Sequence, residues 1–191
     1  YDTFAAYPGT AEAVVTNLPT GRAEYWEVPR RDEHFLLLQA TCAMPVLFQP
    51  IRLDGDTPYL DGGCSDAIPW KRALEVGCDR VVVVLTRERS YRKEPEQMMP
   101  LFRRVYRKYP AFLEDLRTRA ERYNQCREEL FQMEREGRIL VIAPEDTRGF
   151  SRTERDRKKI LALWQDGFFA GLRAAEAVRA FWTEEHLPEE A

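Results

Sequence analysis

The feature of this chain that most constrains its fold is an aspartate followed directly by two glycines, in the segment Tyr59-Leu60-Asp61-Gly62-Gly63. A hairpin-like pattern precedes this segment, and a helix-like stretch at 67–76 follows it. Glycine loses more backbone entropy on folding than any other residue, so a pair of glycines indicates a tight turn or a close approach. The pattern therefore predicts an acid at the tip of a strand, on a loop of the kind that carries catalytic groups. A solvated acid in an ordinary Asp-Gly turn is the alternative interpretation.

The composition of the chain fits one compact domain with helices and strands. It has 191 residues, of which 44% are hydrophobic and 32% are charged, which is enough for a buried core. The net charge of −3 indicates no binding surface for nucleic acid or for an anionic membrane surface, and no apolar run approaches the length of a membrane span. No signal peptide is visible, and the four cysteines have no CxxC spacing. We therefore expect a cytoplasmic protein with reduced thiols and no zinc site.

Alternating apolar residues around turn-forming residues predict two β-hairpins in the first third of the chain. The paired strands are expected at 11–18 with 23–28, around the turn 17–21, and at 51–53 with 59–60, around the turn 54–56. Between the hairpins, the short apolar segment from Phe35 to Cys42 fits either a buried helix or a strand. Its leucine, glutamine and alanine residues favour the helix, and Pro45 and Pro50 then break the chain into a loop.

A continuous β-branched run from Arg80 to Thr86 is the clearest strand pattern in the chain. Such a run is typical of a strand that is buried on both faces of a parallel sheet. A helix from Ala67, capped by Asp66 and ended by Gly77, is expected to lead into this strand through a right-handed crossover. A second buried strand is expected at 138–143.

Three further helices are expected in the second half of the chain. They are expected at 99–109, at 111–136, and from Thr153 or Asp156 to about Trp182. Pro110 opens the long middle helix and Gly137 ends it. Apolar residues at helical spacing give that helix a core-facing side, and its arginines and glutamates are expected on a solvated face. No repeat or linker divides the chain, so residues 1–191 are expected to form one domain with a frayed tail at 184–191.

The other chemistry-bearing residues lack the context of a known type of site. His34 and His186 are the only histidines and have no ligand-spaced partner, which argues against a metal site and a Ser-His-Asp triad. No serine stands in a G-x-S-x-G elbow, and Ser65 is expected to cap a helix. Cys42 and Cys64 flank the Asp-Gly-Gly segment without a base beside them, so both are expected to be small packing residues.

A series of short motifs runs in a fixed order through most of the chain. The motifs are Ala40-Thr41-Cys42-Ala43-Met44-Pro45, Phe48-Gln49-Pro50, Tyr59-Leu60-Asp61-Gly62-Gly63, Ile68-Pro69 and Gly77 to Val84, followed by Tyr91-Arg92-Lys93, Tyr109-Pro110, Arg122-Tyr123-Asn124 and Gly137 to Ile142. In this order they resemble the C-terminal half of the patatin-like phospholipase family, and within it the bacterial single-domain branch. The resemblance extends from about Asp2 to about Gly167.

The resemblance implies a three-layer α/β/α sandwich with a mainly parallel central sheet. It also implies a serine acyl hydrolase that cleaves carboxylic esters of lipids through a Ser-Asp dyad. Asp61 corresponds to the catalytic aspartate, and Gly62 and Gly63 complete its motif. In the family, the serine elbow and the oxyanion loop precede this region. We therefore expect the chain, which begins at Tyr1, to be the C-terminal portion of a patatin-like domain whose N-terminal segment supplies both.

The expected partners follow from this chemistry, and two other functions stay open. We expect a lipid or another ester as the substrate and no metal or organic cofactor, and a transient contact with a membrane surface stays open. The chain could instead be a non-catalytic α/β interaction or regulatory module that retains the fold without the nucleophile. A third hypothesis is acyl transfer, in which an alcohol takes the place of water.

Overall fold

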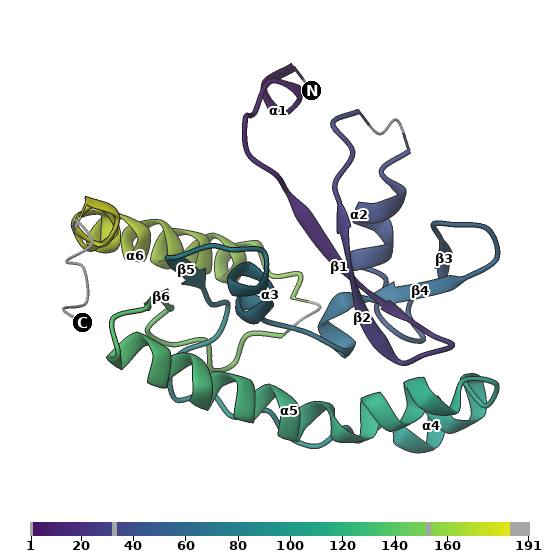
Figure 1. The fold of residues 1–191 in the computed structure, drawn as a ribbon. Coiled ribbons are helices and arrows are strands. Elements are labelled where there is room, and N and C mark those ends of the chain that lie inside the picture. The colour runs from purple at the N-terminus through teal and green to yellow at the C-terminus, as the bar shows by residue number, and fades with distance from the viewer. Residues whose placement is uncertain (1, 32–33, 152–153, 184–191) are drawn as a thin grey trace, which may run out of the picture. The chain divides into compact units, whose positions relative to one another are not determined.

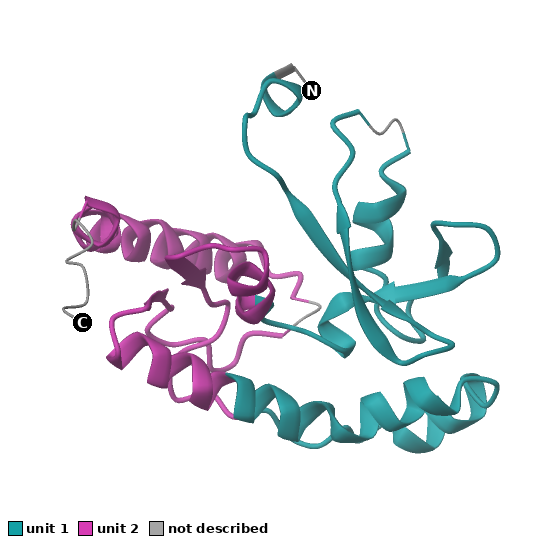
Figure 2. Ribbon diagram, in the orientation of Figure 1, with its two compact units in different colours: residues 1–69, 93–126 teal, residues 70–92, 127–191 magenta. Residues whose placement is uncertain are grey.

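The computed structural model describes residues 2–31, 34–151 and 154–183 and contains both helices and strands (Figure 1). The chain forms two compact units (Figure 2). Unit 1 consists of residues 1–69 and 93–126, and unit 2 consists of residues 70–92 and 127–191. The long helix α5, Pro110–Arg135, contributes its first part to unit 1 and its last part to unit 2.

Unit 1 contains a four-stranded sheet in which the strands follow the order β2-β1-β4-β3. The strands are β1 Glu12–Asn17, β2 Arg22–Glu27, β3 Ile51–Arg52 and β4 Pro58–Asp61. Both predicted hairpins are confirmed, because β1 pairs with β2 and β3 pairs with β4 in antiparallel register. The strand β1 also pairs with β4, which sets Val15 opposite Asp61.

The larger sheet is antiparallel, so the expectation of a mainly parallel central sheet is not confirmed. The physical reason is the length of the connections. Short turns join β1 to β2 and β3 to β4, whereas a parallel pair needs a crossover of about a dozen residues or more. The parallel pairing in the described chain belongs to the two-stranded sheet of unit 2.

Unit 2 holds that smaller sheet, formed by β5 Val81–Val84 and β6 Ile139–Ile142. The predicted parallel strands are therefore confirmed. The expectation that the first strand is buried on both faces is wrong, because Val81 and Val83 are buried while Val84 is 69% exposed. Successive side chains of a strand point to opposite faces, and the described residues of unit 2 cover only one of them fully.

The helix that leads into β5 begins later than expected. It is α3, Trp70–Glu75, and it does not start at Ala67. Pro69 disfavours the helical conformation of the residue before it, so Asp66 instead accepts a hydrogen bond from the Ile68 amide at 3.3 Å, in a local turn. Gly77, with φ +92°, ends the helix as predicted.

The remaining helices follow most of the expected boundaries. They are α1 Asp2–Ala5, α2 Leu36–Thr41, α4 Met99–Val105, α5 and α6 Arg157–Thr183, with one 3₁₀ turn, η1 Gly62–Cys64. The helical interpretation of the segment after Phe35 is confirmed, and Gly137 ends α5 with φ +74°. Asp156 caps α6 through the Lys158 amide at 2.9 Å. Thr153, His186 and the predicted tail at 184–191 lie outside the described residues.

Apolar side chains are buried on both faces of the sheet of unit 1. On one face, Leu60 packs with residues of α4 and α5, including Phe112. On the other face, Tyr59 packs with Leu37 and Ala40 of α2. Neighbouring residues of β4 thus point into two different cores. The strand that ends at Asp61 is fixed from both sides.

Leu60 provides a test of this packing, because its side chain is fully buried. We predict that Leu60→Ala lowers the free energy of unfolding by about 2–5 kcal/mol, through the lost burial and the cavity left behind. Denaturant titration followed by circular dichroism measures this change. Leu47, which is 62% exposed, is the matched control, and Leu47→Ala should change the free energy by less than about 0.5 kcal/mol. Equal midpoints for the two variants would contradict the packing described.

Candidate functional site

Asp61 is the last residue of β4, and hydrogen bonds hold its backbone from two directions. Its amide donates to the Ala43 carbonyl at 3.0 Å, and its carbonyl accepts from the Thr16 hydroxyl at 2.9 Å. Ala43 follows α2, and Thr16 belongs to β1. The Thr16 hydroxyl also lies 2.7 Å from the Ser65 hydroxyl. Ser65 is the C-cap of the 3₁₀ turn η1 and does not stand at the start of a helix as expected. The position of Asp61 is therefore set by segments far apart in the sequence.

The carboxylate of Asp61 is half-buried and is held by the loop that follows it. Its Oδ1 atom accepts a hydrogen bond from the Gly63 amide at 2.7 Å, and this contact caps the 3₁₀ turn η1. Within the described part of the chain, no donor is bonded to its second oxygen, Oδ2. One oxygen is thus held by the loop, and the other makes no hydrogen bond to the described residues.

Different steric contacts explain why Gly62 and Gly63 are glycines. A Cβ atom at Gly62 would stand 2.2 Å from the Val14 carbonyl oxygen and 2.5 Å from the Val14 carbonyl carbon. Real Cβ atoms do not approach backbone atoms so closely, so β1 leaves room only for glycine. A Cβ atom at Gly63 would stand 3.1 Å from Oδ1 of Asp61, where it would crowd the carboxylate. The second glycine keeps the space beside the acid open.

Two arginines of α5 hold the carbonyls of the same loop. Arg119 Nε donates to the Gly63 carbonyl at 2.7 Å, and Arg122 Nη2 donates to the Cys64 carbonyl at 3.1 Å. The expectation that the arginines of this helix lie on a solvated face is wrong for Arg127, which is 2% exposed, and for Arg119 and Arg122, which bind the loop. The spacing of three residues between Arg119 and Arg122 places both on one side of the helix, but the sequence gives no signal that this side faces the loop.

Asp115 is a buried acid that supports this arrangement. It forms an ion pair with Arg122, with Oδ1 2.6 Å from Nη1. Burial raises the pKa of the Asp115 carboxyl to about 6, while the positive charges of Arg122 and Arg119 oppose the change. Its Oδ2 atom is buried and has no hydrogen-bond partner among the described residues. The ion pair orients Arg122 toward the loop but carries an electrostatic cost.

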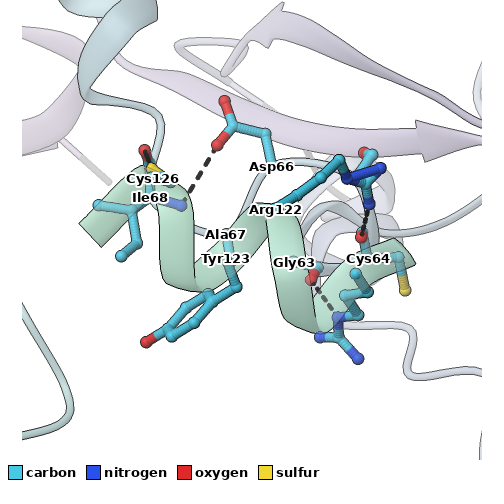
Figure 3. Close-up of a pocket in the computed structure, with 10 residues that line it drawn as sticks. Gly63, Cys64, Asp66, Ala67, Ile68, Arg122, Tyr123 and Cys126 are labelled. Atoms are coloured by element: carbon cyan, nitrogen blue, oxygen red, sulfur yellow. Dashed lines mark hydrogen bonds between the residues drawn. The ribbon is translucent and has the colours of Figure 1, made fainter. Parts of the chain in front are cut away.

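A small pocket lies between the loop and α5, and Figure 3 shows the residues around it. It is lined by Gly63, Cys64, Ser65, Asp66, Ala67, Ile68, Arg119, Arg122, Tyr123 and Cys126. Its cavity volume of about 40 Å³ admits one or two waters and excludes an acyl chain. The pocket is therefore too small to bind the acyl chain of a lipid.

Two larger apolar cavities lie along α2, on either side of Leu38. One, of about 420 Å³, is lined by Leu38, Gln39, Cys42, Ala43, Phe48, Gln49 and Ile51. The other, of about 530 Å³, is lined by Phe4, Ala11, Val28, Pro29, Arg30, Phe35 and Leu38. The first includes Ala43, whose carbonyl binds the Asp61 amide. Volumes and linings of this kind suit an apolar ligand.

The cysteines differ in burial, and the described residues contain no cluster of metal-binding side chains. Cys64 is buried as a packing residue, but Cys42 is exposed and lines the first apolar cavity, so the expectation fails for Cys42. Among residues 2–31, 34–151 and 154–183, no group of three or more His, Cys, Asp or Glu side chains could hold a metal ion. None of the helices in these ranges is both long and apolar enough to cross a membrane.

Comparison with known protein families gives two matches in different parts of the chain. Residues 109–183 match the family model described as a domain of unknown function, DUF6363. Residues 7–74 match the family model described as patatin-like phospholipase, and this range includes Asp61, Gly62 and Gly63. No curated protein matches the chain. The match at 7–74 supports the patatin-like family, and with it a relation to lipid ester hydrolases, for the segment that carries the candidate acid.

Proposed function

We propose that this chain carries the general base of a serine acyl hydrolase that cleaves carboxylic esters of lipids, and that the base is Asp61. The observation that carries the proposal is the geometry of its carboxylate. The Gly63 amide binds Oδ1, and Oδ2 accepts no hydrogen bond from the described residues. The patatin-like match over residues 7–74 supports the same assignment.

The proposed reaction has two steps. A serine hydroxyl is a weak nucleophile until a base takes its proton, so Asp61 Oδ2 accepts that proton as the serine oxygen bonds to the ester carbonyl carbon. The carbon–oxygen bond to the alcohol then breaks, and the alcohol leaves with the proton. Water hydrolyses the acyl-enzyme in the second step, again with Asp61 as base. The chemistry needs neither a metal nor an organic cofactor.

The serine and the oxyanion donors are assigned to a segment that precedes Tyr1 in the polypeptide. In this proposal, residues 1–191 are the C-terminal portion of one patatin-like domain of the bacterial single-domain branch, with a three-layer α/β/α architecture and a cytoplasmic location. Gly62 and Gly63 complete the motif of the base by allowing close packing and by fixing Oδ1. Each backbone donor of an oxyanion site typically contributes roughly 3 kcal/mol to transition-state stabilisation.

The apolar cavities along α2 favour an ester with an apolar acyl group. Ala43 lines the cavity of about 420 Å³, and its carbonyl accepts a hydrogen bond from the Asp61 amide. The wall of this cavity includes Phe48, which is 54% exposed. A fatty acyl chain would cover this side chain and gain the free energy of apolar burial. The proposed substrate is therefore a lipid ester.

Asp61→Asn in the full-length protein tests the proposed base. An amide cannot take the proton of the serine, so we predict that kcat for a short-chain nitrophenyl ester falls by roughly 10²–10⁴-fold. The fold should persist, because the side-chain oxygen of asparagine can still accept from the Gly63 amide. Asp56→Asn is the matched control, since Asp56 lies in the exposed hairpin turn, and its turnover should equal that of the wild type. Turnover near the wild-type value in a folded Asp61→Asn protein would defeat the assignment.

The alternative functions predict other results. A non-catalytic module has no reactive serine, so a fluorophosphonate probe would leave the full-length protein unlabelled. An acyl transferase would form a new ester when an alcohol is added, and product analysis distinguishes that ester from the free acid.

Gly62→Ala tests the close approach that places the acid. The added methyl group would overlap the Val14 backbone, which cannot yield without breaking the pairing of β1 and β4. We predict a loss of unfolding free energy of roughly 3 kcal/mol or more. Gly167→Ala in α6 is the control, because nothing lies within 4 Å of its added carbon, and it should stabilise the helix by about 0.5–1 kcal/mol. Two variants of equal stability would refute the steric argument.

The buried acid Asp115 predicts a pH dependence of stability. Its pKa is raised by burial from an ordinary 3.8 to about 6, so the folded protein binds this proton more tightly than the unfolded chain. The resulting stability is present below about pH 4 and is lost as the pH rises through about 6. Relative to Asp115→Asn, the wild type should gain on the order of 2 kcal/mol between pH 7 and pH 4. A difference between the two proteins that does not vary over this range would contradict the raised pKa.

A further inference from the structure

Side chains of α5 complete the hydrogen bonding of the 3₁₀ turn η1, which follows the candidate acid. The first carbonyl of the turn, that of Gly62, accepts hydrogen bonds from two backbone amides. The next two carbonyls accept from side chains. Arg119 Nε lies 2.7 Å from the Gly63 oxygen, and Arg122 Nη2 lies 3.1 Å from that of Cys64. Carbonyls at the end of a helical turn lack donors within the turn, and basic side chains satisfy them. We call this pair of arginines the clamp.

Other contacts anchor the clamp. Three residues separate Arg119 from Arg122, so both side chains leave the same side of α5. Nη1 of Arg122 forms an ion pair with Oδ1 of the buried Asp115 at 2.6 Å, and Nη2 also donates to the Asp115 carbonyl at 3.1 Å. Figure 3 shows Arg122 beside the Cys64 carbonyl that it binds. A donor that is already held in place loses little freedom when it binds the loop.

The loop needs support from outside because two of its residues are adjacent glycines. Glycine has the widest choice of backbone conformations, so the pair Gly62-Gly63 restrains the turn weakly. The Gly63 amide is the group that binds Oδ1 of Asp61, at 2.7 Å. If the turn opened, this amide would move away, and the carboxylate would lose the contact that fixes its direction.

The clamp holds the loop without occupying the carboxylate. Among the described residues, neither arginine forms an ion pair with Asp61. The Cβ position of Gly63 lies 3.1 Å from Asp61 Oδ1 and 3.6 Å from Arg119 Nη2, so the carboxylate and this guanidinium lie on the same side of Gly63. A salt bridge to a carboxylate opposes its protonation. By binding the carbonyls instead, the clamp avoids this effect on a group that has to accept a proton.

We propose that Arg119 and Arg122 are positioning residues for Asp61. By holding the carbonyls of Gly63 and Cys64, they keep the Gly63 amide on Oδ1 of the acid. This inference rests on the proposed function, in which Asp61 is the base, and both arginines act through the loop. Because both lie in the range 109–183, the segment that matches DUF6363 serves to place the acid.

Hydrogen exchange at the Gly63 amide tests the clamp without any turnover. The measurement uses the full-length protein and nuclear magnetic resonance. Arg119→Met and Arg122→Met each remove a donor and keep an unbranched apolar stem. We expect the Gly63 amide to exchange roughly tenfold faster or more in either variant, since a hydrogen bond to a charged group is lost. Arg117→Met is the matched control, because Arg117 is exposed and pairs with Glu114, and it should leave this exchange unchanged.

The kinetics of a short-chain nitrophenyl ester separate positioning from substrate binding. We expect kcat to fall by roughly 10–100-fold in the two clamp variants, because a base displaced by about 1 Å is a poor catalyst. KM should stay at the wild-type value, since neither arginine binds the substrate in this proposal. Arg117→Met should keep both constants. Circular dichroism verifies that each variant is folded at the assay temperature.

Two results would overturn the proposal. One is Gly63 exchange that is equal in the clamp variants and in the control, and the other is a raised KM with an unchanged kcat. If the wild type hydrolyses no ester, the proposed function fails, and the exchange data still decide whether the arginines hold the loop.

A second substitution decides the matter if the methionine variants do not fold. In Arg122→Lys, one ammonium group cannot hold Asp115 and Cys64 in the geometry of the guanidinium. Gly63 exchange that is faster than in Arg117→Lys supports the clamp, and equal exchange refutes it.

Discussion

The structure of the site depends on the contact between β1 and β4. The pairing sets Val15 opposite Asp61, and Gly62 then passes so close to the Val14 carbonyl that no side chain fits. The chain must turn at that point, and the turn brings the Gly63 amide to the carboxylate of Asp61. The direction of the acid is thus a consequence of a steric limit between two strands, and the apolar cores on both faces of the sheet keep those strands in place.

The helix α5 links the two parts of the chain that match known families. Arg119 and Arg122 belong to the range that matches DUF6363, and they bind the carbonyls of Gly63 and Cys64 in the range that matches patatin-like phospholipase. The ion pair between Asp115 and Arg122 orients the arginine, but it requires a buried carboxylate, which is electrostatically unfavourable. A loop held by charged groups from a distant helix keeps its geometry better than one held by its own residues alone. This gives the segment of unknown function a structural role beside the candidate acid.

Local turn chemistry made much of the fold predictable from the sequence. Gly77 and Gly137 end helices where expected, and the two hairpins form around their turn residues, because each signal acts within a few residues. The pairing of β1 with β4 was not predictable, since it joins segments about forty residues apart without a local signal. The helix does not start at Ala67 as expected, because Pro69 disfavours a helical conformation of the residue before it. At the site, the sequence identified Asp61 and its glycines, but the arginines of α5 became visible only through long-range contacts.

The most direct test of the account is an experimental structure of the full-length protein, including the segment that we propose to precede Tyr1. The account predicts a serine from that segment with its hydroxyl oxygen roughly 2.6–3.2 Å from Oδ2 of Asp61, while the Gly63 amide still binds Oδ1. A structure in which Oδ2 faces bulk solvent, with no hydroxyl nucleophile within reach, would contradict the account.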